Sequence, residues 1–77
     1  MMNDLIRWAA KDVDDCEAGI TMSEMWVEHY EAEAAKVAFD AAAHADMLFW
    51  ADWHRQSADA GRQRLPELRR RLEYVGG

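Results

Sequence analysis

Three kinds of side chain in this 77-residue sequence could do chemistry: one cysteine at Cys16, fifteen acidic residues, and three histidines at His29, His44 and His54. Helical di-iron sites place a glutamate three residues before a histidine, which puts both ligands on one helix face. Those positions hold Trp26, Ala41 and Ala51 instead. Because no complete ligand set forms, we expect no metal and no other cofactor.

Nucleophilic catalysis finds no better support. Cys16 lies on an apolar stripe with no histidine near it in the sequence, which is typical of a buried packing residue. No motif surrounds Ser23 or Ser57, and there is no glycine-rich phosphate loop. The sequence therefore predicts a protein that is not an enzyme.

The cysteine count and the hydropathy bear on location. A single thiol cannot form a disulfide within the chain, and it fits a reducing compartment. The start has no basic leader, and no apolar run reaches roughly 20 residues, the length that spans a membrane. We expect a cytoplasmic protein that does not enter a membrane.

The elements that would position any site are helical, because apolar residues recur every three or four positions and β-branched residues are few. A first helix is predicted to end at Gly19, since glycine commonly terminates helices. Thr21 and Glu24 match a capping box, and no glycine or proline follows until Gly61, which predicts one long helix from about 22 to about 58. Gly61 and Pro66 then predict a break before a short amphipathic helix.

The expected fold is all-α: a helical hairpin or three-helix unit built on this central helix, in a single domain over residues 1–77. A helix of about 37 residues is roughly 55 Å long, and the flanking helices would not cover all of its apolar surface. We therefore expect a homodimer. Its central helices would pair antiparallel through a seam of closely spaced alanines, namely Ala34, Ala38, Ala41 and Ala45. The alternative is that this seam packs on the first helix.

Charge is divided along the chain. Residues 1–54 carry twelve acidic and three basic side chains, whereas residues 55–77 carry six arginines and three acids. Such a division can orient a partner. We expect a negative face that binds another protein, made by Asp12, Asp14, Asp15, Glu17, Glu24, Glu28 and Glu31. Simple solvation is the other explanation for these acids.

Two further groups of residues could make contacts. Tryptophan is typical of binding hot spots, so Phe49, Trp50 and Trp53 are predicted to contact a partner or the second subunit, or to form the core. Arginine clusters bind phosphate backbones. The alternative nucleic-acid contact would therefore use Arg62, Arg64, Arg69, Arg70 and Arg71. These arginines could also pair with acids on a neighbouring helix.

These patterns favour a small, acidic, non-enzymatic helical protein that binds a larger protein and regulates or inhibits it. By association, a phage or mobile-element inhibitor of host defence is one such protein, since small acidic helical proteins are common products of phages and mobile elements. The alternative function is a small nucleic-acid-binding regulator that uses the arginine-rich segment. A structural subunit of a larger assembly is a third possibility.

Overall fold

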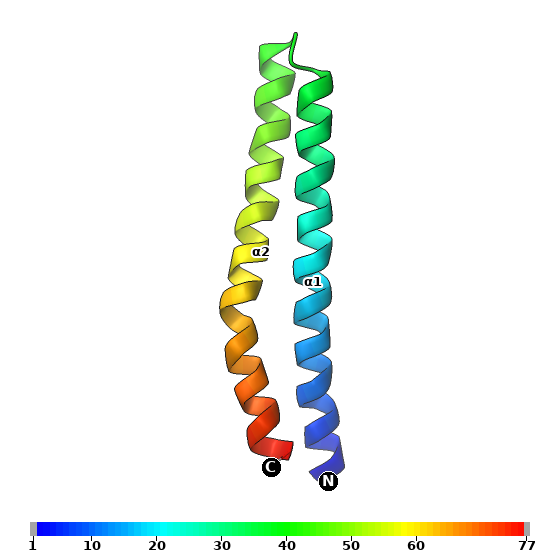
Figure 1. Cartoon of the computed structure of the whole chain (residues 1–77), viewed down its shortest axis with the longest axis vertical. Coiled ribbons are helices and arrows are strands. Elements are labelled where there is room, and N and C mark those ends of the chain that lie inside the picture. The colour runs from blue at the N-terminus through cyan, green and yellow to red at the C-terminus, as the bar shows by residue number, and fades with distance from the viewer. Residues whose placement is uncertain (1, 77) are drawn as a thin grey trace.

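The computed structural model describes residues 2–76, and the side chains of residues 4–76. Two helices, α1 (Met2–Lys36) and α2 (Ala41–Gly76), run antiparallel and are joined by residues 37–40 (Figure 1). They form a rod of 58 × 15 × 12 Å, with both ends of the chain at the same end of the rod. The all-α class expected from the sequence is confirmed.

The long central helix predicted over residues 22–58 is wrong, because the chain reverses inside it. The N–H of Asp40 donates to the carbonyl of Val37 at 2.9 Å, which tightens the chain into a turn. The Asp40 carboxylate then caps α2, where its Oδ1 accepts the N–H groups of Ala42 and Ala43 at 3.1 and 3.2 Å. An aspartate before a run of alanines is thus the local feature that starts α2.

The same turn divides the alanine seam that the sequence predicted. Ala34 is buried in the last turns of α1, and its carbonyl lies 2.8 Å from Nδ1 of His44. Ala38 belongs to the connection, while Ala41 and Ala45 are exposed in the first turns of α2. The four alanines therefore do not form a continuous stripe on one helix.

The helix end predicted at Gly19 and the helix start predicted at Thr21 are also wrong. Both residues lie inside α1, and none of the described glycines has a positive φ. Glu24, the second member of the predicted capping box, extends to Arg62 of α2 instead. A helix that runs on leaves no free amide groups at this point for a cap to satisfy.

Pro66 does not begin a separate helix either, because α2 continues through Gly61 and Pro66. A proline inside a helix costs about 3 kcal/mol. Leu65, Leu68 and Leu72 face α1 around it, and burying one leucine fully contributes about 1.5–3 kcal/mol. Leu68 is buried and Leu65 and Leu72 are half-buried, so their combined contribution is large enough to offset the proline. Figure 1 shows α2 bowed in its yellow-to-orange part, which includes both residues.

The side chains between the helices follow a seven-residue repeat. Buried and half-buried positions alternate in steps of three and four along both helices, as in a coiled coil. The residues that follow this repeat in α1 and the turn are Ile6, Ala9, Val13, Cys16, Ile20, Ser23, Val27, Tyr30, Ala34 and Val37. In α2 they are His44, Met47, Ala51, His54, Ala58, Gly61, Leu65, Leu68, Leu72 and Val75.

The core along this seam is thin. Its fully buried residues are Ala9, Val13, Ala34, Ala51, Ala58 and Leu68. Ile20 packs directly against the backbone of Gly61, where an added Cβ would stand 2.7 Å from Cγ1 of Ile20. Small residues allow this approach but bury little apolar area. The tryptophans of the protein are exposed and lie outside this seam.

Candidate functional site

One edge of the seam carries a ladder of ion pairs, which we call the charged flank. Three carboxylates of α1 pair with three guanidinium groups of α2 at seven-residue intervals. The pairs are Glu17–Arg69 at 3.4 Å, Glu24–Arg62 at 2.6 Å and Glu31–Arg55 at 2.5 Å. Each of these six residues directly follows a seam residue in the sequence, so all six lie along the same edge of the seam.

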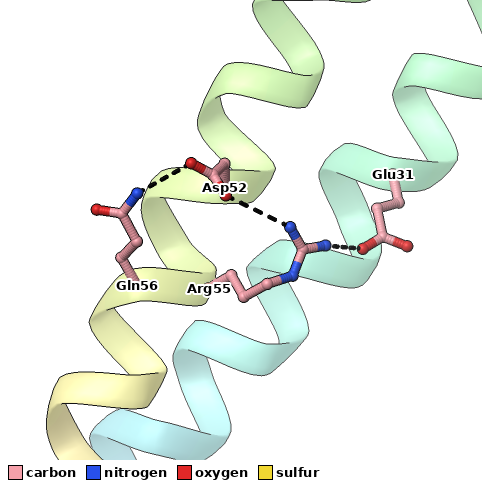
Figure 2. A network of polar contacts seen from close by, with 4 residues as sticks. All are labelled: Glu31, Asp52, Arg55 and Gln56. Atoms are coloured by element: carbon pink, nitrogen blue, oxygen red, sulfur yellow. Dashed lines mark hydrogen bonds and ion pairs between the residues drawn. The ribbon is translucent and has the colours of Figure 1, made fainter.

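Arg62 and Arg55 each also bind a carboxylate of their own helix. Arg62 donates to Asp59 at 2.8 Å, and Arg55 lies 3.7 Å from Asp52. Figure 2 shows Arg55 between Asp52 and Glu31, with Gln56 donating to the other oxygen of Asp52. About half of each arginine is exposed, so solvent screens these pairs and each contributes about 0–1 kcal/mol. The ladder sets the register of the hairpin more than its stability.

The opposite edge of the seam carries a hollow near the middle of the rod. Both helices contribute to it, and its volume is about 450 Å³. Its lining is Asp12, Asp15, Cys16, Gly19, Ile20, Ser23, Ser57, Ala60, Gly61, Arg64 and Leu68. The Cys16 thiol donates to the Gly61 carbonyl at 3.3 Å, so this thiol is engaged in holding the helices together.

A large apolar surface adjoins this hollow on the side of the turn. Seven residues along a seven-residue repeat return to the same edge, so Gly19 leads to Trp26 and Asp15 leads to Met22. On α2 the same step leads from Ser57 to Trp50 and from Ala60 to Trp53. With Met25 and Phe49 beside them, these side chains form what we call the apolar flank: Met22, Met25, Trp26, Phe49, Trp50 and Trp53. All six are classed as exposed.

Aromatic contacts join the two halves of the apolar flank. The His54 ring stacks on Trp26 and on Tyr30, with centroids 5.7 and 5.6 Å apart. Trp53 meets the same ring edge-on at 4.9 Å. His29 packs edge-on against Trp26 at 5.5 Å. Two of the three histidines therefore act as aromatic packing groups, which makes the apolar flank one continuous surface across both helices.

The acidic residues predicted to form one binding face are divided by the fold. Glu17, Glu24 and Glu31 belong to the charged flank, where arginines partner them. Asp12 and Asp15 line the hollow on the other edge. Asp14 and Glu28 stay exposed on α1.

The arginines of α2 are divided in the same way. Arg62 and Arg69 hold the charged flank, while Arg64 lines the hollow. Arg70 and Arg71 are exposed near the open end of the rod. The arginine-rich segment therefore presents three different surfaces.

Lys11 pairs with one of the aspartates that line the hollow. The hydrogen bond from Lys11 to Asp15, with the negative charges of Asp15 and Asp12, raises the pKa of Lys11 above its usual value. Within residues 2–76, no three His, Cys, Asp or Glu side chains gather in a way that could hold a metal ion. Neither helix of this part of the chain is long and apolar enough to cross a membrane.

Sequence analysis identified Phe49, Trp50 and Trp53 but missed the α1 half of the apolar flank. Met22, Met25 and Trp26 were hidden because the predicted helix start at Thr21 gave them the role of a first turn. The seven-residue repeat would have found them, since it runs without interruption through Gly19. No family model matches this chain, and neither curated proteins nor solved structures yield a match to it.

Proposed function

We propose that this chain is a non-enzymatic interaction protein that binds a larger protein and regulates or inhibits it. The apolar flank carries the proposal. Large exposed apolar patches mark surfaces that bind other proteins, because water does not favour leaving them uncovered. Three tryptophans, two methionines and a phenylalanine, gathered on one edge of a thin rod, form such a patch. Tryptophans at a protein contact commonly contribute most of the binding energy.

The apolar flank is a stronger candidate for this contact than the acidic residues. Glu17, Glu24 and Glu31 already hold the hairpin in register through their arginines. The acidic excess that remains, Asp14 and Glu28 included, supports attraction of a basic partner over a distance rather than close contact. Acid side chains would then speed association, while the apolar flank determines how long the complex lasts.

The homodimer expected from the sequence is also part of this proposal. A homodimer and a complex with a larger protein would both cover the apolar flank. We therefore propose that the two forms exclude each other, which makes self-association a control on partner binding. A partner that binds the flank would convert the dimer into a complex with one copy of this chain.

A photo-crosslinking experiment tests the larger partner. A photoreactive phenylalanine analogue replaces Phe49 on the apolar flank, or Gln63, which is exposed two seven-residue repeats further along α2. In an extract of the native host, the probe at position 49 should label one discrete larger protein that the probe at position 63 does not label. A second substitution, Trp53→Glu, should abolish that labelling. Labelling of no larger protein, or equal labelling from both positions, would overturn the proposal.

Nucleic-acid binding is the second candidate function. It is favoured by Arg64, Arg70 and Arg71, which make no ion pair within residues 4–76. The net charge of −6 opposes it, since phosphate backbones repel an acidic chain. Binding to random DNA or RNA that weakens with added salt, and that is lost on replacing these arginines by glutamate, would decide for this candidate.

A further inference from the structure

We propose that a second copy of this chain covers the apolar flank, so that two hairpins form a four-helix bundle with both turns at the same end. The inference takes from the proposed function only that the apolar flank contacts protein. It adds which protein occupies the flank in the purified chain and how that protein is oriented. Three observations support it: the accessible area, the distribution of large side chains, and the charges beside the hollow.

The accessible area of the chain is larger than that of a compact protein of the same mass. The chain exposes 5947 Å², whereas a compact folded monomer of 8.9 kDa exposes about 4800 Å². The excess, about 1100 Å², is close to the roughly 800 Å² that each partner buries in a standard stable interface. A second hairpin packed along the rod would remove an area of this size.

The distribution of side chains leads to the same conclusion. The seam inside the hairpin buries four alanines, a valine and a leucine, while tryptophans and methionines lie on the apolar flank. In a monomer this places the largest hydrophobic contribution outside the fold. In a four-helix bundle the apolar flank becomes the centre, and the ion pairs of the charged flank stay at the surface where solvated charges belong. The residue types at each edge therefore fit the bundle.

The orientation follows from charge. With a two-fold axis along the rod, α1 of each copy faces α2 of the other at the same height. Trp26 then meets Trp50 and Trp53 of the second copy. Asp12 and Asp15 come opposite Arg64 of the second copy, because all three line the hollow at one level. The reversed orientation would place α1 against α1. It would bring the aspartates of the two copies together or bury them under the tryptophans, away from Arg64 of the second copy. Lys11, which pairs with Asp15, would then be the cation that remains beside these desolvated charges.

Sedimentation equilibrium tests the dimer. At micromolar concentration the full chain should give twice the mass of 8.9 kDa. Trp53→Glu should raise the dissociation constant by more than roughly tenfold, because a charge enters the centre of the contact. Phe39→Glu is the matched control, since Phe39 is 88% exposed in the turn and lies off the apolar flank, and this variant should associate like the parent chain. A parent chain that stays monomeric with full helicity, or an unchanged constant in Trp53→Glu, would overturn the inference.

A second measurement does not depend on disturbing the apolar flank. In a Cys16→Ala background, Phe39→Cys should be joined rapidly into dimers by a short bifunctional maleimide, because the two turns lie at one end of the bundle. Glu73→Cys is the control and should react slowly, because Glu73 is exposed in the row of Asp52 and Asp59, beside the charged flank. Equal rates for the two cysteines would overturn the orientation even if Trp53→Glu unfolds. A monomeric chain that still labels a larger protein from position 49 would refute the dimer alone, and a dimer that labels none would refute the larger partner alone.

Discussion

The two edges of one seam differ in how completely the chain satisfies them. On the charged flank, Glu24 finds Arg62, and the same pairing recurs one repeat above and one repeat below. On the apolar flank, Trp26 and Trp50 contact aromatic neighbours but remain exposed, beside the hollow. Both edges are built by the same seven-residue repeat, so helix geometry cannot account for the difference.

Different residues therefore set the alignment of the two helices and contribute most of the apolar surface that could stabilise them. Half-exposed ion pairs contribute little free energy but are specific in position, so they align two helices whose fully buried residues are mostly alanines. Burial of tryptophan contributes much more but is not directional. Placing the ion pairs on one edge fixes the hairpin and leaves the other edge available for a second protein surface.

The largest expected effect concerns the two glycines beside the hollow. Gly61→Ala places a methyl group 2.7 Å from Cγ1 of Ile20 and should force the helices apart on the apolar side while the charged flank holds. Overpacking costs about 1–3 kcal/mol, against a gain of up to about 1 kcal/mol in helix propensity. Gly19→Ala meets no atom within 4 Å and should gain only the propensity.

Urea denaturation followed by circular dichroism, at one fixed protomer concentration, should therefore shift the two glycine variants in opposite directions, about 2 kcal/mol apart. Equal stabilisation by both substitutions would show that the close approach at Gly61 is not a constraint. The hollow would then owe its shape to its lining side chains alone.

A smaller change in stability is expected at the turn. The position of the turn determines which residues of α1 and α2 share an edge of the seam. Asp40→Ala removes the acceptor of the Ala42 and Ala43 amide groups and should lower the free energy of unfolding by about 1 kcal/mol. Thr21→Ala lies inside α1 and should change it by less than about 0.5 kcal/mol. Thermal unfolding of the two variants checks this order. A larger loss for Thr21→Ala would restore the helix start that the sequence predicted.

The smallest effect is expected on the charged flank. Arg62→Glu replaces two ion pairs by repulsion from Glu24 and Asp59, yet half of the side chain is exposed, so the loss should be about 1 kcal/mol or less. It should shrink in 1 M salt, where the Debye length is about 3 Å. Arg70→Glu, without an ion pair in residues 4–76, serves as the control, because Arg70 belongs to neither flank. Loss of self-association by Arg62→Glu would mean that the two flanks are not independent.

The sequence predicts the helical class well and the helix boundaries poorly. Each local feature used to place a boundary, such as Gly19 or the capping box at Thr21, is worth about 1 kcal/mol. Pro66 is worth about 3 kcal/mol. The packing of twenty seam residues together outweighs these local preferences, because two helices that lie side by side bring most of those residues into contact at once. A polar residue at a seam position, such as Ser23 or His54, obscures the repeat when apolar residues alone are counted.

The helical class, the acidic character before residue 55 and the basic character after it can be read from residue types alone. Alanine content and the three-and-four spacing of apolar residues are local properties, and they act before any tertiary contact forms. The turn at Asp40, the pairing of Glu24 with Arg62 on one edge and the gathering of Trp26, Trp50 and Trp53 on the other depend on how the two helices pack. Glu24 and Arg62 are 38 positions apart, so their pairing depends on where the chain reverses. That point is selected by the summed packing of both helices rather than by any single residue along them.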